Sequence, residues 1–159
     1  MYRISDKIVH PMHGAGIVED IETKRIAGKN MEYYVLRLTT GSVTVLVPVA
    51  SCDAIGVRPV ISAEEAEALL ALFPALEAED NANWNRRYRE NMEHLKSGNL
   101  KEVAFVIKSL MLREQKKPLS TGERKMLASA KQILISELTL ATGRSEAEIE
   151  AILRSAIEA

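Results

Sequence analysis

The sequence holds a single cysteine, Cys52, and no apolar run that approaches the roughly 20 residues needed to span a bilayer. One cysteine excludes an internal disulfide bond and a cysteine-based metal cluster. The first residues, MYRISDKIVHP, lack the apolar segment of a signal peptide. Hydrophobic residues still make up 47% of the 159 residues, which is enough to form a core. We therefore expect a soluble, cytoplasmic protein of one domain or two small ones.

Signals for catalysis and for metal binding are also weak. His10 and His13 lie close together, but no third ligand is recognisable, so a structural role at the end of a strand is favoured over a metal site. Cys52 has no activating base nearby in the sequence, which favours a buried and inert thiol. HGAG at 13–16 lacks the Lys-Ser/Thr of a phosphate-binding loop, so its glycines are expected in a tight turn or bulge. We predict a non-enzymatic protein without metal or cofactor.

Charge is distributed unevenly along the chain, although the formal net charge is only −1. Residues 83–131 hold 12 Lys and Arg against 5 Asp and Glu, a net charge of +7. The flanking residues 1–82 and 132–159 have net charges of −5 and −3. A basic middle of this kind is a candidate electrostatic footprint for nucleic-acid phosphates.

Up to about Arg58 the sequence has the pattern of short β-strands. Segments 7–22, 31–40 and 42–50 are rich in Val, Ile, Tyr and Thr and alternate partly with a period of two. AGKN at 27–30 and TTGS at 39–42 are typical of hairpin turns, because Gly and Asn tolerate positive φ. Several short strands in so short a segment predict a small, strongly bent antiparallel β barrel of the SH3 or Tudor type.

The periodicity becomes helical after residue 59, and three capping boxes mark helix starts. They are Ser62 with Glu65, Ser120 with Glu123, and Ser145 with Glu148. Asn83 can cap a helix that Gly98 ends, LKEVAFVIKSLMLREQKK follows as another helix, and the polar segment 77–82 is a connector. We predict an α+β fold, with a β domain at 1–60 and an all-α domain of about five helices at 61–159.

The only tryptophan begins a charged helix in the stretch NANWNRRYRENMEHLKSG. One face of this helix carries Trp84, Tyr88, Met92 and Leu95, so Trp84 could head a row of core residues. The first turns, however, carry Arg86, Arg87 and Arg89, where the helix dipole disfavours each cation by about a few tenths of a kcal/mol. A local rule broken without local gain often marks a functional site. Arginines beside an aromatic residue suit phosphate contact and either base stacking or insertion into a groove.

A second basic group surrounds the expected turn between the next two helices. It consists of Arg113, Lys116, Lys117, Arg124 and Lys125. One reading is a solvated connection with scattered charges. The other is a turn that meets the DNA backbone near the first basic group.

Four segments of the chain together resemble the CarD/CdnL family of bacterial transcription regulators. They are HPMHGAGIVEDIE, IGVRPVI, NWNRRYRENMEHLKSGN and LSTGERKMLASAKQILISEL, in the family's order. The first segment is also similar to the polymerase-interacting module of transcription-repair coupling factor. The tryptophan-arginine helix and the STGERKML helix distinguish this chain from that ATPase.

The resemblance implies that a Tudor-like N-terminal module binds the β subunit of RNA polymerase. It also implies that the helical domain reaches promoter DNA at the upstream edge of the transcription bubble. There the tryptophan that matches Trp84 would wedge into the minor groove and stabilise the open complex, and residues matching Arg86 and Arg87 would contact the backbone. To these we add, from the two basic groups, the expected DNA contacts Arg89, Lys116, Lys117, Arg124 and Lys125.

The family often uses two basic residues against the polymerase, and the chain departs from this pattern. The first aligns with Lys24, which is followed by Arg25, whereas the second aligns with Leu46. The resemblance therefore implies a more apolar contact in this chain, through Val45, Leu46 and Val47 and through pairing of a strand edge.

Together these observations predict a monomeric regulator that binds RNA polymerase and promoter DNA, largely without sequence preference, and no membrane. A sequence-specific repressor is the first alternative, although no helix-turn-helix pattern with base-reading side chains is recognisable. The second alternative is an adaptor that binds proteins only, with a basic surface that is merely solvated.

Overall fold

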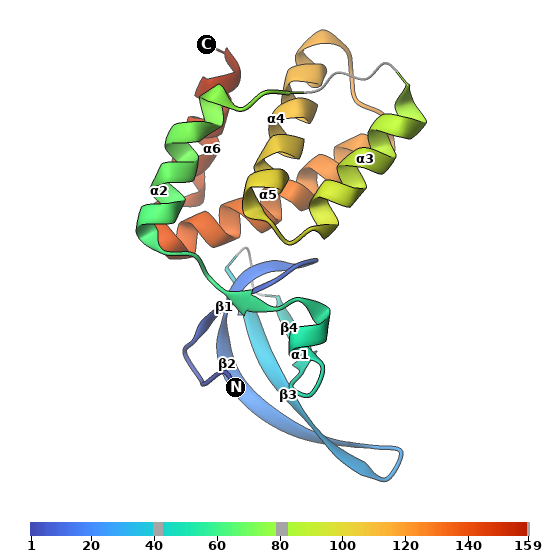
Figure 1. The fold of residues 1–159 in the computed structure, drawn as a ribbon. Helices are drawn as coiled ribbons and strands as arrows, with labels where there is room; N and C mark the ends of the chain where they lie inside the picture. Colours follow the sequence, from blue (N-terminus) through green and yellow to red (C-terminus); the bar gives the residue numbers. More distant parts are fainter. Residues whose placement is uncertain (40–42, 79–82, 159) are drawn as a thin grey trace.

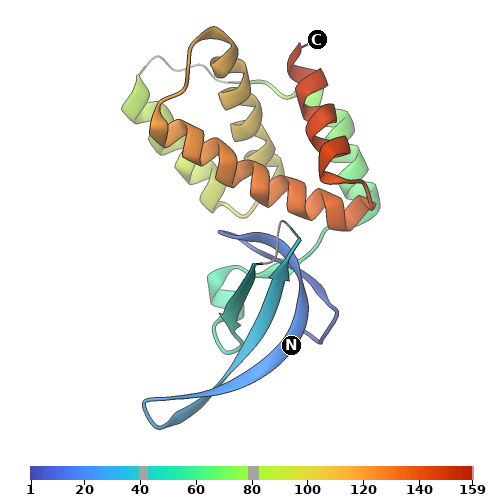
Figure 2. The same ribbon diagram turned by 180° about the vertical axis from the view of Figure 1, so that it is seen from behind.

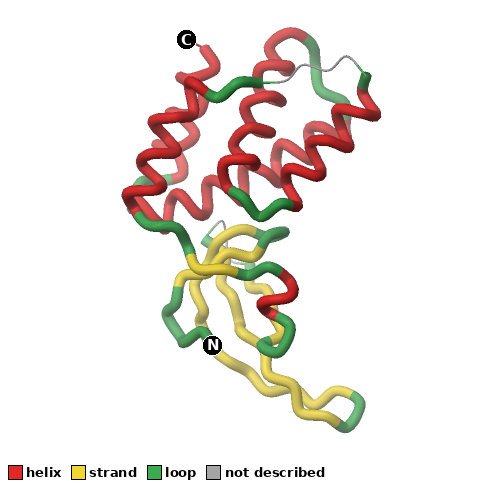
Figure 3. Tube along the Cα trace, viewed as in Figure 1, coloured by secondary structure: helices red, strands yellow, loops and turns green. Residues whose placement is uncertain are grey.

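The computed structural model describes residues 1–39, 43–78 and 83–158, which form a β-sheet and a group of helices (Figure 1). Among these described residues, the strands lie between Lys7 and Pro59, and five longer helices follow them in the sequence (Figure 3). Seen from both sides, the helices gather at one end of the sheet, and one long hairpin points away from them (Figures 1 and 2). The predicted α+β class is confirmed.

In the part of the chain that the structure describes, five antiparallel strands form one sheet in the order β4-β3-β2-β1-β5. The strands are β1 (Lys7–His10), β2 (Gly14–Ile26), β3 (Lys29–Leu38), β4 (Thr44–Pro48) and β5 (Arg58–Pro59). Within the described residues, β4 pairs only with β3 and β5 only with β1, so the sheet is open rather than the closed barrel that was predicted. The outer strands are short, with 5 residues in β4 and 2 in β5.

The β2–β3 hairpin is the longest part of the sheet. Its ladder extends to the pair Ile26–Lys29, and positive φ angles at Ala27 (52°) and Gly28 (79°) make a two-residue turn. The turn predicted at 27–30 is thus confirmed, whereas residues 40–42 of the turn predicted at 39–42 lie outside the described residues. A register shift between Val18 and Asp20 marks a bulge.

The helices begin largely where the capping residues predict. They are α1 (Cys52–Ile55), α2 (Ala63–Leu72), the 3₁₀ turn η1 (Phe73–Ala75), α3 (Trp84–Lys96), α4 (Leu100–Lys116), α5 (Thr121–Thr142) and α6 (Glu146–Glu158). In all three capping boxes the serine Oγ accepts the backbone N–H of the glutamate, at 3.1–3.2 Å. The short α1 was not predicted, and residues 79–82 of the predicted connector lie outside the described residues. No described helix is long and apolar enough to cross a membrane.

Each part has its own hydrophobic core. Inward-facing residues of the sheet, among them Ile8, Val18, Tyr34 and Leu36, form a small cluster closed by Cys52 of α1. The helices bury a larger cluster, to which α4 and α5 contribute most of the residues. Because α5 also contacts β2, this helix belongs to the helical core and to the contact between the two parts.

Side chains of α5 bind the sheet at three points. Ser136 Oγ accepts the backbone N–H of Ala15 at 2.8 Å, and Gln132 Nε2 donates to the carbonyl of His13 at 3.1 Å. This contact requires glycine at position 14, because a Cβ atom there would lie 2.6 Å from Ser136 Oγ and because φ is +96°. Gly14, which follows the turn at 11–13, therefore allows a close approach of α5, whereas Gly16 lies within β2 and not in the tight turn or bulge that was predicted for the HGAG glycines.

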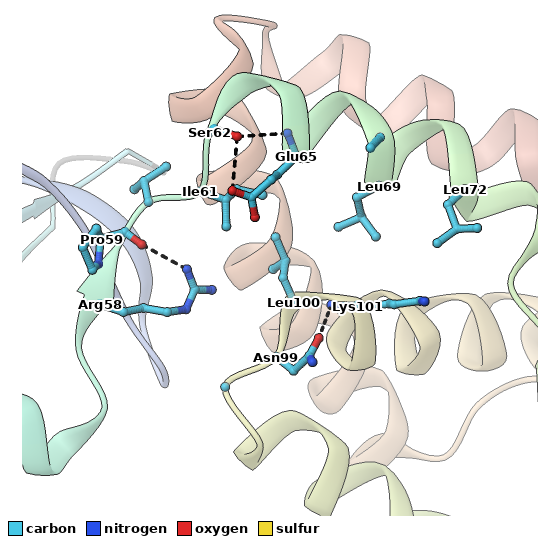
Figure 4. A pocket seen from close by; sticks show the side chains of 13 residues that line it. Arg58, Pro59, Ile61, Ser62, Glu65, Leu69, Leu72, Asn99, Leu100 and Lys101 are labelled. Carbon is cyan, nitrogen blue, oxygen red and sulfur yellow. Dashed lines mark hydrogen bonds between the residues drawn. The ribbon is translucent and has the colours of Figure 1, made fainter.

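The third contact is an ion pair between β5 and α5. Glu137 is fully buried and accepts two hydrogen bonds from the Arg58 guanidinium, at 2.6 and 2.7 Å. It also accepts the backbone N–H of Ile61 at 3.0 Å. Figure 4 shows Arg58 and Ile61 on the segment that leads into α2, where Ser62 caps the helix. The pair therefore fixes the chain between the sheet and the helices.

We expect Arg58→Met to lower the free energy of unfolding by about 3 kcal/mol, because it leaves the buried Glu137 carboxylate without its cation. Denaturant unfolding of the full chain measures this loss. Arg144→Met is the matched control, because its ion pair with Glu67 is exposed and should contribute far less. The double variant Arg58→Met/Glu137→Met should recover much of the loss. Equal effects of Arg58→Met and Arg144→Met would contradict the importance of the buried pair.

Candidate nucleic-acid interface

The sequence left two roles open for Trp84, a core residue or a contact with DNA, and in the structure its side chain is only partly buried. It is the first residue of α3, after Asn83, whose Oδ1 accepts the N–H of Arg86 at 3.1 Å. Tyr88, Met92 and Leu95 of the same face pack against the helical core, but Trp84 remains 42% exposed. Its ring stacks on Tyr88, with centroids 5.1 Å apart and planes 19° apart. Tyr88 thus supports one side of the indole, and part of the ring remains accessible to solvent.

The start of α5 forms a seat for this indole. Trp84 Nε1 donates to Ser120 Oγ at 3.0 Å, and the same oxygen caps α5 by accepting the N–H of Glu123 at 3.2 Å. A Cβ atom at Gly122 would lie 3.4 Å from Tyr88 Cε2 and 3.8 Å from Trp84 Cζ2, which are ordinary contact distances, so both rings lie against the first turn of α5. Sequence reasoning identified Ser120 only as a helix cap and missed its hydrogen bond with Trp84.

Arg87 does not lie where the predicted phosphate contact requires it. Its side chain is buried, with Nε 2.8 Å from Glu123 Oε2 and Nη2 3.2 Å from Oε1. Burial alone would raise the pKa of Glu123, but the hydrogen bonds and charge of Arg87 outweigh it and hold that pKa below its ordinary value. Helical periodicity explains the placement, because residue 87 faces α5 while residues 86 and 89 point outward. We therefore assign Arg87 to holding α3 on α5.

The other basic residues of α3 are exposed. The side chain of Arg86 is 70% exposed and pairs with Glu90 at 3.0 Å, one turn along the helix. Arg86 and Arg89 line a polar cavity of about 490 Å³ together with Asn83, Asn85, Glu90 and Glu93. The two arginines are accessible to a phosphate, and the two carboxylates reduce the positive potential there.

The second basic group lies next to the first. The beginnings of α3 and α5 lie side by side in both views, and the Trp84–Ser120 hydrogen bond joins them (Figures 1 and 2). Lys116 and Lys117 at the end of α4, and Arg124 and Lys125 in the first turns of α5, are all exposed. Arg113 is half-buried. The fold thus places exposed basic residues at the start of α3, at the end of α4 and at the start of α5, and the α3 and α5 groups lie on neighbouring helix starts.

The residues expected to contact the polymerase lie on the sheet. Lys24 and Arg25 are exposed near the hairpin tip, and Leu46 on the outer strand β4 is 41% exposed. The register Leu46–Val35–Asp20 places Leu46 and Lys24 on the same face of the sheet. Val47, in contrast, is 1% exposed in the sheet core, and Val45 is half-buried on that inner face. Because side chains alternate between the two faces of a strand, Val47 points into the core, and its predicted contact with the polymerase is wrong.

The surroundings of His10, His13 and Cys52 suit structural roles. His10 and His13 stack with ring centroids 4.6 Å apart, and His10 Nδ1 accepts the N–H of Met12 at 3.1 Å. Burial, and secondarily the charge of His13, lower the pKa of His10. Cys52 is buried, which raises its pKa. No group of three or more His, Cys, Asp or Glu side chains in the described part of the chain could hold a metal ion.

The contribution of the Arg87–Glu123 pair to stability should depend on pH. Because folding lowers the pKa of Glu123, the stabilisation is complete at neutral pH and is lost as the pH falls below the ordinary value of about 4.3. We expect Arg87→Met to lower the free energy of unfolding by about 3 kcal/mol at pH 7 and by much less at pH 3. Urea unfolding of both proteins at the two pH values measures this. A loss of equal size at both would show that the lowered pKa of Glu123 does not contribute.

Comparison with known proteins agrees with this arrangement of the chain. Residues 2–61 match the family described as the CarD-like/TRCF RID domain, and residues 68–154 match the family described as CarD, C-terminal domain. The chain is 36% identical over 150 residues to the "Putative transcription factor YdeB" of Bacillus subtilis (strain 168), an alignment that covers 94% of this chain and 98% of that protein. Both halves of the chain and their order are therefore accounted for, and the chain belongs to the CarD/CdnL family of RNA polymerase-binding transcription regulators.

Proposed function

We propose that this chain is a non-enzymatic regulator of transcription initiation that stabilises the promoter open complex. In this proposal the sheet, residues 1–60, binds the β subunit of RNA polymerase. The helices, residues 61–159, contact promoter DNA at the upstream edge of the transcription bubble. The protein acts as a monomer in the cytoplasm. The observation that carries the proposal is the half-exposed indole of Trp84, which is held by Ser120 and Tyr88 at the start of two helices whose first turns carry exposed basic residues.

The DNA contact divides into a wedge and a set of charges. Trp84 enters the minor groove at an unstacked base step, where an apolar ring replaces part of the lost stacking. Its stack on Tyr88 and its hydrogen bond to Ser120 support this role, because a ring that is already held loses little conformational entropy on binding. Arg86, Arg89 and the basic residues from α4 and α5 contact phosphates, which position the protein without reading sequence.

The polymerase contact uses the outer strand of the sheet. Within the described residues one side of β4 has no partner strand, and Leu46 is exposed on it. A strand edge of this kind can accept an extended segment of another protein by main-chain hydrogen bonds. Leu46, with Lys24 on the same face, supplies side-chain contacts, whereas the buried Val47 supports β4 from within.

We expect Trp84→Ala to shorten the lifetime of the open complex by about five- to a hundred-fold, because stacking on a base contributes roughly 1–3 kcal/mol. The variant should still bind polymerase, since the indole is remote from β4. Decay of open complexes after addition of a competitor measures the lifetime.

The controls are Trp84→Phe, which should retain part of the effect, and thermal melting. Since the indole is 42% exposed, Trp84→Ala should lose only about 1–2 kcal/mol of stability. A folded Trp84→Ala protein with an unchanged open-complex lifetime would exclude the wedge. Tight binding by the free protein to one DNA sequence would favour a repressor instead.

We expect Leu46→Glu to weaken binding of the full chain to the polymerase β subunit by about tenfold or more, because it places a charge in an apolar contact. Lys24→Glu should also weaken binding, and this effect should diminish as salt rises. Calorimetry with the purified subunit measures both. Ile4→Glu is the matched control, since Ile4 is a 55% exposed residue of the segment before β1. If Leu46→Glu and Lys24→Glu both bind as the control does, the interface lies elsewhere.

A further inference from the structure

An apolar groove lies between α3 and α5, beside the candidate DNA surface. We call it the α3–α5 groove. It has a volume of about 470 Å³. Tyr88, Met92 and Leu95 of α3 form one wall, Met126 of α5 lies on the other, and Met12 and Ile55 from the sheet part close one end. Met12 is 76% and Ile55 37% exposed, so large apolar side chains at this site remain in contact with water.

The charges around the α3–α5 groove have a single sign. Lys96 of α3 and Lys125 of α5 line it, and among the described lining residues there is no Asp or Glu. Both lysines are exposed, and no ion pair to a carboxylate of the described chain involves either one. An apolar cavity with two ammonium groups is complementary to a molecule with an apolar body and an anionic group.

A second cavity of the same protein serves as a comparison. It lies between α2 and the start of α4, has a volume of about 660 Å³, and is shown in Figure 4. Glu65 as well as Lys101 lines it, and Arg58 there is already paired with Glu137. Its charges therefore give no preference for an anion, which distinguishes the α3–α5 groove.

We propose that the α3–α5 groove binds a small amphipathic organic anion, with an aliphatic or aromatic body and a carboxylate group. The volume lies within the range of about 300–1,000 Å³ that is typical of small-molecule sites. The body would lie against Tyr88, Met92 and Met126, since methionine side chains adapt to irregular apolar shapes. The carboxylate would pair with Lys125 on the α5 side of the groove.

Binding in the α3–α5 groove is coupled to the candidate DNA surface through two residues. Tyr88 forms a wall of the groove and stacks on Trp84, with ring centroids 5.1 Å apart. Lys125 lines the groove and belongs to the second basic group. An anion that engages Lys125 reduces the charge available to phosphate, so the ligand and DNA weaken each other's binding. This coupling rests on the proposed function, whereas ligand binding itself does not.

The test is a titration of the free full-length protein with dodecanoate below its micelle concentration, followed by Trp84 emission and by calorimetry. Trp84 is the only tryptophan, and its stacking partner lines the groove, so a saturable change in emission is expected. Dodecanol serves as the neutral probe. Lys125→Gln should weaken dodecanoate binding by about tenfold and leave dodecanol binding unchanged.

Two phenylalanine variants separate the α3–α5 groove from the rest of the surface. Ser129 is exposed on α5 and lines the groove, so Ser129→Phe should fill it and abolish binding of dodecanoate. Ala128 is its exposed neighbour outside the lining, so Ala128→Phe should bind normally. Both variants should melt as the unchanged protein does.

Absence of saturable binding, equal affinity for dodecanoate and dodecanol, or normal binding by Ser129→Phe would each overturn the proposal. Loss of polymerase binding in Ser129→Phe, with dodecanoate binding retained, would show a protein-contact surface instead. Because the titration contains neither polymerase nor DNA, its failure leaves the proposed function intact. Calorimetric binding would likewise stand if Trp84→Ala had no effect on open complexes.

Discussion

The buried carboxylate of Glu137 joins the sheet to the helices. Its oxygens accept both arms of the Arg58 guanidinium and the backbone N–H of Ile61, at 2.6–3.0 Å. A planar bidentate pair constrains direction as well as distance, and charge-assisted hydrogen bonds are stronger than neutral ones. Isolated inside the protein, the carboxylate would be strongly unfavourable, so the helices and β5 have one favoured arrangement. The contacts of Ser136 with Ala15 and of Gln132 with His13 support the same arrangement.

Helix α5 carries this constraint to the candidate DNA surface. Ser120 at its start receives the indole N–H of Trp84, and Glu137 near its end holds Arg58. The two residues are 17 positions apart along the helix, a distance of about 26 Å. Because α5 is also packed in the helical core, it fixes the position of Ser120 relative to Glu137. In the proposed function, docking of the sheet on the polymerase therefore fixes where the indole can meet DNA, and affinity from one surface becomes effective concentration at the other.

Local signals in the sequence predicted much of the fold, but they could not predict contacts between residues that are far apart in the sequence. The capping serines and the turn at Ala27 and Gly28 act on neighbouring residues, so the helix starts and the hairpin were predictable. Barrel closure was predicted wrongly, because it depends on pairing between strands remote in sequence. The Arg58–Glu137 pair spans 79 positions, and no local pattern indicates it. Within the candidate site, the helical and strand periods could have improved the prediction of which side chains are exposed. Position 87 falls on the inner face of α3 and position 47 on the inner face of β4, which periodicity alone could have indicated.

The net charge counted from the sequence overstates the positive charge that is available to DNA, because the count ignores contacts within the fold. Residues 83–131 have a net charge of +7, but several of their cations are engaged within the fold. Arg87 is paired with Glu123, Lys108 donates to the carbonyl of Pro74 at 2.5 Å, and Lys131 pairs with Glu150 at 2.8 Å. Arg86, although exposed, lies 3.0 Å from Glu90. The charge that can reach phosphates is therefore smaller than the count, and each lost contact removes part of the salt-dependent affinity. In the proposed function, we therefore expect such a surface to bind duplex weakly by itself, and the fixed geometry from Glu137 to Ser120 to be more important than the number of basic residues.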